Sequence, residues 1–135
     1  MKKQTKIEDW IMYAESDLAI AKQGKTEKKV LYESLCFHCQ QAAEKAIKSV
    51  LVFYKIDFPK THDIVYLLNL LLTQNISVPK VIMESAFLTD YAVTVRYPGD
   101  DNMIESTEYK KALRVSTKVL EWARIETSNK TDKLF

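Results

Sequence analysis

Apolar side chains recur along this chain at intervals of three and four residues, the spacing of one face of an α-helix. The first such stripe consists of Ile7, Ile11, Ala14, Leu18 and Ala21. Gly24 follows this stripe, and glycine is suited to the left-handed backbone conformation that ends many helices. Thr26, with Glu27 behind it, is placed to cap a second helix. The pattern therefore predicts a first helix that ends near Gly24 and a second that begins at about Glu27.

The second predicted helix is long and extends from about Glu27 to about Tyr54. Its apolar stripe consists of Leu31, Leu35, Cys39, Ala42, Ala46, Val50 and Phe53. A helix of this length in a small domain needs other helices packed along it, because packing of the apolar face supplies most helical stability in proteins. The small residues Ala42, Ala43 and Ala46 would let a neighbouring helix approach the middle closely.

Three further helices are expected downstream. The third runs from Ile64 to about Thr73 with Thr61 or Asp63 as its cap, the fourth from about Lys80 to Val95 with Ser77 as its cap, and the fifth from Ser106 or Thr107 to about Glu126. No segment alternates apolar and polar residues over a strand's length. Short connections imply antiparallel neighbours. We therefore predict an all-α, up-and-down antiparallel bundle of about five helices, four long and one short.

Composition agrees with this architecture and narrows the function. The chain has 135 residues with only two Gly and three Pro, which favours one helical domain, expected over residues 5–127, and a disordered tail over 128–135. The formal net charge of +2 is too small to indicate a nucleic-acid or membrane partner. The N-terminal residues lack the apolar core of a signal peptide, and no apolar run could span a bilayer. We expect a cytoplasmic protein.

The two cysteines, Cys36 and Cys39, lie three residues apart on the second predicted helix. A disulfide between them would distort the helix, and zinc sites normally need four ligands, whereas no second Cys pair exists. We therefore predict no metal site and interpret both residues as small side chains that face the core.

Polar residues occupy one face of the same helix. His38, Gln41, Lys45 and Lys48 are separated by three, four and three residues, with Gln40 and Glu44 on the neighbouring line. One interpretation is a solvated face with contacts among Gln40, Glu44 and Lys48 worth a few tenths of a kcal/mol each. His38 and Gln41 border the apolar stripe, so they could instead bond a partner helix, a twin subunit or a ligand.

Two downstream motifs could also bind an anion. Thr61-His62-Asp63 has the composition of a helix start, where exposed backbone N–H groups can hold a phosphate beside His62. Arg96 lies at the end of the fourth predicted helix, where the helix dipole favours a cation, and its guanidinium could equally grip a phosphate or carboxylate. Tyr97 beside it offers a ring for stacking.

Four of these stretches together resemble the HEPN domain family, named for nucleotide binding in higher eukaryotes and prokaryotes. They are Trp10 with Ala14-Glu15-Ser16-Asp17-Leu18, the run Phe37–Lys48, Thr61-His62-Asp63, and Tyr91 with Arg96-Tyr97-Pro98, spread over about residues 5 to 125. The resemblance implies a helical bundle that commonly dimerises. It also implies pairing with a minimal nucleotidyltransferase in toxin–antitoxin-like or stress modules.

Many members of the wider superfamily are metal-independent ribonucleases with an Arg followed four to six residues later by a His. This chain departs from that motif, because both His38 and His62 precede every Arg. The first hypothesis is therefore a non-catalytic, homodimeric binding module for a nucleotide such as ATP or GTP, for a nucleotidyltransferase, or for both, with no required cofactor. The residues expected to line its site are His38, Gln41, Lys45, His62, Arg96 and Tyr97.

Specific roles and two alternatives follow from these residues. In the binding module, Lys45 and Arg96 would hold phosphate while Tyr97 stacks on a base. The second hypothesis is a ribonuclease toxin acting on RNA, with His62 as general base and Arg96 stabilising the developing phosphate charge. The third is a purely structural partner whose polar helix face covers a nucleotidyltransferase surface.

Overall fold

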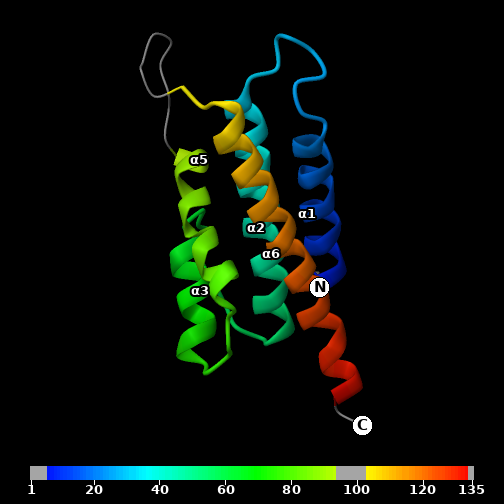
Figure 1. Ribbon diagram of the computed structural model, residues 1–135. Helices are drawn as coiled ribbons and strands as arrows, with labels where there is room; N and C mark the ends of the chain where they lie inside the picture. The colour runs from blue at the N-terminus through cyan, green and yellow to red at the C-terminus, as the bar shows by residue number, and fades with distance from the viewer. Residues whose placement is uncertain (1–5, 94–102, 134–135) are drawn as a thin grey trace.

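All the regular elements of the described chain are helical. The computed structural model describes residues 6–93 and 103–133, with side chains described over 6–92 and 103–128. The elements are α1 (Ile7–Lys22), α2 (Tyr32–Phe53), α3 (Ile64–Thr73), α4 (Lys80–Met83), the 3₁₀ helix η1 (Glu84–Thr89), α5 (Asp90–Val93) and α6 (Ser106–Lys133) (Figure 1). No strand occurs within these residues, and the predicted all-α bundle is confirmed.

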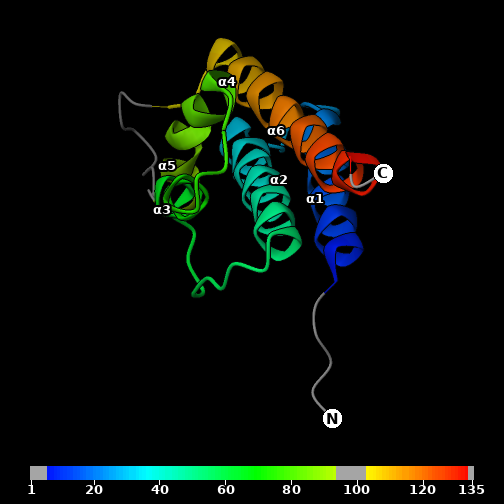
Figure 2. The ribbon, with the colours of Figure 1, turned by 90° about the horizontal axis from the view of Figure 1, so that it is seen from below.

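Helix α2 is the central element of the bundle. It contacts α1 and α6 on one side, and α3, η1 and α5 on the other, as the view along the bundle in Figure 2 shows. Ala42, Ala43 and Ala46 are fully buried, so the small side chains do lie where neighbouring helices approach. α6 is also tied to α1, because the Tyr109 hydroxyl donates a hydrogen bond of 2.6 Å to the Ala21 carbonyl.

The start of α2 differs from the prediction. Gly24 does take the left-handed conformation, with φ of +65°, but α2 begins at Tyr32 and its N-cap is Leu31, so the predicted start at Glu27 with a Thr26 cap was wrong. Tyr32 stacks on Tyr109 of α6 at 5.3 Å between ring centroids. This long-range contact holds the first turn of α2, and the residues before it form a loop.

The third helix follows the prediction closely. α3 spans Ile64–Thr73, and the Asp63 carboxylate caps it by accepting a hydrogen bond of 3.2 Å from the Tyr66 backbone N–H. The Thr61 hydroxyl oxygen accepts a hydrogen bond of 3.1 Å from the Asp63 N–H, so Thr61 supports the capping residue. His62 lies between them, at the entrance to the helix.

The predicted fourth helix is not continuous, which corrects the expectation of one helix from Lys80 to Val95. It begins after Pro79 rather than at a Ser77 cap, and passes from α4 into η1 and then α5. Ile82, Ser85 and Leu88 are all buried and lie three residues apart. A 3₁₀ helix has three residues per turn, so η1 places Ser85 and Leu88 on one line against the bundle, directly after Ile82 of α4.

The last helix is longer than predicted. α6 continues to Lys133, past the expected end at about Glu126. Within the described residues, no helix is both long enough and apolar enough to cross a membrane.

Candidate functional site

The buried carboxylate of Asp17 joins α1 to the polar face of α2. Its two oxygens lie 2.9 Å from His38 Nδ1 and 2.6 Å from Lys45 Nζ. Asp17 is 8% exposed, because it lies beside Ala14, Leu18 and Ala21 in the contact between the helices. His38 and Lys45 are therefore held against α1 rather than projecting into solvent.

A second buried carboxylate, Glu44 of α2, joins three further groups. It accepts hydrogen bonds of 2.7 Å from Gln40 Nε2 and from Lys48 Nζ, and it lies 2.8 Å from His62 Nδ1. Gln41 Nε2 extends this series of hydrogen bonds by donating to Gln40 Oε1 at 2.7 Å. The Glu44 side chain is only 4% exposed. The predicted contacts of Glu44 with Gln40 and Lys48 exist, but they are buried, not solvated as the first interpretation proposed.

Burial explains why Glu44 needs so many partners. A carboxylate taken out of water is costly unless it is paired and hydrogen-bonded. Lys48 supplies the positive charge, and its side chain is itself 9% exposed. The Lys48 ammonium also lies 5.5 Å from the ring centroid of Trp10 and 5.7 Å from that of Phe58, close enough for cation–π attraction. Lys48 thus faces Glu44 as Lys45 faces Asp17, and in each group the lysine charge balances the carboxylate charge.

The two imidazoles of the cluster share one arrangement. Each faces a carboxylate through Nδ1, which favours the tautomer with its proton on that nitrogen and leaves Nε2 as an acceptor on the opposite edge of the ring. The His62 side chain is 58% exposed and that of His38 is 29% exposed. Both rings are therefore oriented by the protein, and the ring of His62 is the more exposed of the two.

We use the name seam for the α1–α2 surface that carries these groups. It consists of Trp10, Tyr13 and Asp17 of α1 and Phe37, His38, Gln41, Lys45 and Lys48 of α2. Tyr13 and Phe37 are 54% and 39% exposed, the Tyr13 ring lies under Lys45 Nζ at 6.0 Å, and Phe37 meets His38 edge-on at 5.5 Å. Aromatic rings and oriented polar groups therefore alternate along the seam.

Four of the six residues predicted for the site belong to these clusters. His38 and Lys45 meet at Asp17, while Gln41 and His62 are linked through Gln40 and Glu44. Arg96 and Tyr97 lie outside the described residues, so their place in the site stays a prediction. The sequence analysis does not predict the anchoring role of Asp17. An acidic residue at the spacing of the α1 apolar stripe is the signal that could have indicated a buried carboxylate.

The two cysteines lie in the core, as predicted. Cys36 and Cys39 are fully buried. Burial raises the pKa of the Cys39 thiol to about 11, and a hydrogen bond with Ser116 offsets this only in part. The thiol therefore stays protonated at neutral pH, which suits a small side chain packed in the core.

The described residues form a helical bundle in which α2 is joined to α1 through Asp17 and to His62, just before α3, through Glu44. A family model described as HEPN domain matches residues 7–126, and the chain belongs to the HEPN family. No curated protein matches it. The sequence resemblance carried by Phe37–Lys48 and the motifs around it is thus confirmed at the level of the family.

Two crystal structures resemble most of the chain. ST0689, an archaeal HEPN homologue, is 29% identical with a TM-score of 0.72, over 93% of this chain and 100% of its own. TT1696 from Thermus thermophilus is 28% identical with a TM-score of 0.70, over 89% of this chain and 97% of its own. The helical arrangement is therefore shared along nearly the full length.

Proposed function

We propose that this HEPN chain is a non-catalytic binding module that docks a partner protein on the seam. The family resemblance indicates a minimal nucleotidyltransferase as that partner. The observation that carries the proposal is the alternation of exposed aromatic rings with polar groups that the buried carboxylates hold in place. Protein interfaces draw most of their binding energy from such aromatic anchors, and oriented polar groups supply specificity.

Charge balance favours a protein surface over a free nucleotide at the seam. Lys45 Nζ lies 2.6 Å from Asp17, and Lys48 Nζ lies 2.7 Å from Glu44. A phosphate of ATP or GTP would have to compete with these ion pairs, whereas phosphate sites usually present cations that a protein carboxylate does not already neutralise. Nucleotide recognition by this chain would thus depend on the contribution expected from Arg96.

Seam variants test the proposal by isothermal titration calorimetry with the minimal nucleotidyltransferase encoded nearest to this chain's gene. We expect Tyr13→Ser and Phe37→Ser each to weaken the complex about tenfold or more, because each removes an exposed ring that a partner would bury. The matched control is Tyr66→Ser on α3, where the tyrosine is 43% exposed, and it should leave affinity unchanged.

Two results would contradict the docking proposal. One is the absence of a complex, or equal losses in the seam variants and the Tyr66→Ser control. The other is a homodimer, measured by sedimentation, that Phe37→Ser dissociates, since the seam would then be covered by a second copy of the chain. The homodimer expected from the family resemblance is compatible with the proposal only if it uses another surface.

The ribonuclease alternative has one observation in its favour. Glu44 orients the His62 ring through Nδ1, as carboxylates orient catalytic histidines, and the ring is 58% exposed. A general base still needs a partner that stabilises the phosphate charge, and the described residues place no unpaired arginine beside His62. We expect single-stranded RNA to remain as intact with the wild-type protein as with His62→Ala, measured on a denaturing gel. Cleavage by the wild type alone would favour the ribonuclease.

A further inference from the structure

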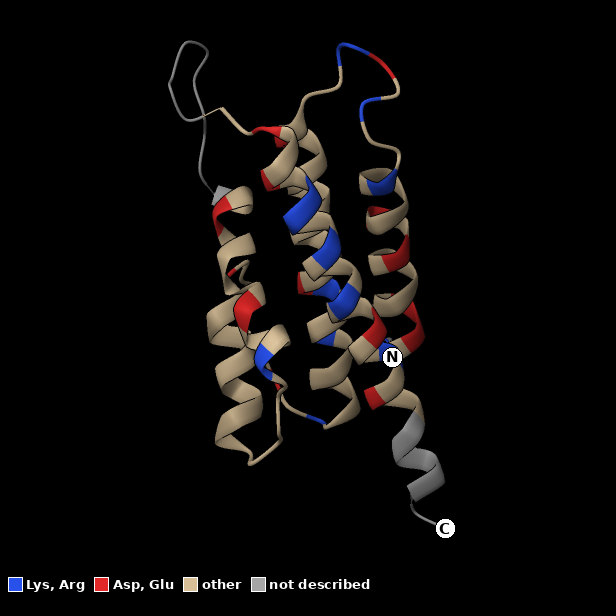
Figure 3. Ribbon diagram, viewed as in Figure 1, with Lys and Arg blue, Asp and Glu red and all other residues tan. Residues whose placement is uncertain are grey.

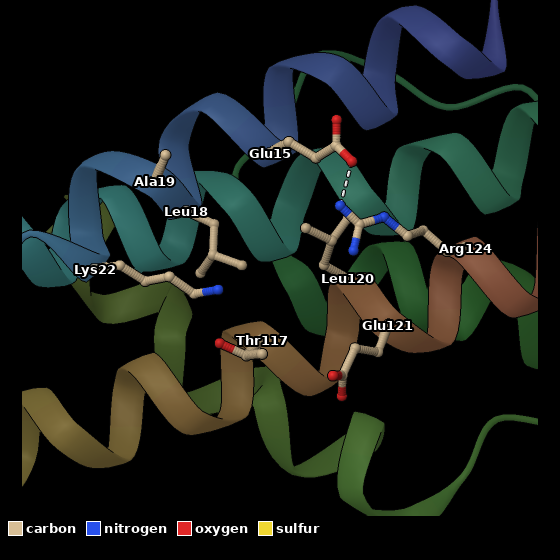
Figure 4. A pocket seen from close by; sticks show the side chains of 8 residues that line it. All are labelled: Glu15, Leu18, Ala19, Lys22, Thr117, Leu120, Glu121 and Arg124. Carbon is tan, nitrogen blue, oxygen red and sulfur yellow. Dashed lines mark hydrogen bonds and ion pairs between the residues drawn. The ribbon is translucent and has the colours of Figure 1, made fainter.

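A groove runs between α1 and α6 on the side of α1 opposite to the seam. It consists of two adjoining hollows of about 180 and 360 Å³, which share Lys22, Thr117 and Glu121 as lining residues. Figure 4 shows the smaller hollow, with α1 and α6 as its two walls. The groove takes no part in the polar clusters of the seam.

Four cations line the larger hollow. Lys110, Arg114 and Lys118 follow one another at intervals of four residues on α6, and Lys22 of α1 completes the set. Figure 3 shows Lys and Arg positions, in blue, recurring along α6. All four residues are exposed, and none forms a salt bridge within the described part of the chain. Like charges four residues apart on a helix destabilise it by a few tenths of a kcal/mol. The fold therefore does not explain this row of charges, whereas an anionic partner would.

At the opposite end of the groove, the positive charge is paired with a carboxylate. Arg124 of α6 forms a salt bridge with Glu15 of α1 across the smaller hollow (Figure 4). Three of the four unpaired cations therefore line the larger hollow alone, and Lys22 lines both; Glu121 is the one carboxylate among the lining residues of the larger hollow. The modest net charge of +2 for the whole chain conceals this local excess.

The floor of the groove is rich in leucine. Leu18 and Leu120 line the smaller hollow, Leu113 lines the larger one, and Thr117 lines both. No aromatic ring is among the lining residues of either hollow, whereas single-stranded nucleic-acid sites combine cations with rings on which bases stack. An apolar floor with a basic rim fits instead a peptide that has both carboxylates and aliphatic side chains. A volume of about 360 Å³ lies at the small end of ligand sites and suits one or two such side chains.

We infer that the α1–α6 groove binds an acidic peptide segment of a partner protein, with aliphatic side chains on the floor and carboxylates against Lys22, Lys110, Arg114 and Lys118. The inference is independent of the docking proposed at the seam. It rests on the unpaired charges and on the chemistry of the floor.

Fluorescence anisotropy with labelled synthetic peptides tests the inference. The probe is a short peptide that alternates Glu and Leu, and its control has Ser in place of every Leu and so the same charge. We expect the Glu/Leu peptide to bind, with an affinity that falls as salt is added, and the Glu/Ser peptide to bind about tenfold more weakly. Arg114→Glu should weaken binding of the Glu/Leu peptide about tenfold or more.

The matched control variant is Lys111→Glu, which makes the same change of charge on the same helix. Lys111 lies 4.6 Å from the ring centroid of Phe87, outside the residues that line the groove, so this variant should change affinity less than about twofold. Both positions are exposed, and circular dichroism and thermal melting verify that the variants fold. Equal losses in the two variants, equal binding of the two peptides, or tighter binding of a labelled oligouridylate than of the Glu/Leu peptide would each overturn the inference.

Discussion

Replacing Glu44 by alanine is expected to lower the free energy of unfolding by about 3–5 kcal/mol. The change removes the acceptor that Gln40, Lys48 and His62 share, while Lys48 stays 9% exposed with its positive charge uncompensated. A buried charge without its partner is far more costly than the net worth of the pair. Urea unfolding followed by circular dichroism measures the loss.

The double variant Glu44→Leu with Lys48→Leu separates charge from packing. It removes both members of the buried pair and fills the space with apolar side chains, so it should lose less stability than Glu44→Ala alone. Asp17→Ala should cost about 1–3 kcal/mol, because its partners His38 and Lys45 keep side-chain exposures of 29% and 24% and can be solvated. A loss of less than about 1 kcal/mol for Glu44→Ala would contradict the description of this carboxylate as the anchor of the cluster.

Truncation of Ile47 to alanine should destabilise the protein by about 2–5 kcal/mol. Ile47 is fully buried on α2, the helix that contacts both halves of the bundle, so the cavity has rigid walls on both sides. Urea unfolding of the purified variant provides the measurement.

Val65 of α3 offers the matched control for this truncation. It is also β-branched and helical, but it is 43% exposed, and Val65→Ala should change the unfolding free energy by no more than about 0.5 kcal/mol. Similar losses in the Ile47 and Val65 variants would show that α2 is not the core helix.

Much of the fold follows from local spacing. The apolar stripes predict the helices, Gly24 predicts the end of the first, and Asp63 predicts the start of the third. What local spacing misses depends on contacts between distant residues. The stack of Tyr32 on Tyr109 sets the start of α2, and burial of Ile82, Ser85 and Leu88 against the bundle favours a 3₁₀ segment within the fourth helical region.

The candidate site was predictable in its residues but not in its pairing. The helical face of His38, Gln41 and Lys45 is evident from the sequence, because it depends on one helix alone. The role of Asp17 and the burial of Glu44 depend on which elements cover that face, and residue spacing within α2 carries no information about its neighbours. The same limit explains why residue spacing alone favours a solvated surface for the Glu44 contacts.

Helix α1 borders both the seam and the groove. Tyr13 and Asp17 face α2, while Glu15 and Lys22 face α6. Because the seam and the groove use different side chains of α1, one copy of the chain could carry an occupant at each. A partner with a folded domain and an acidic, flexible segment could then bind α1 from both sides, with the domain at the seam and the segment in the groove. Such bivalent binding raises the overall affinity through effective concentration, even when each of the two contacts alone is weak.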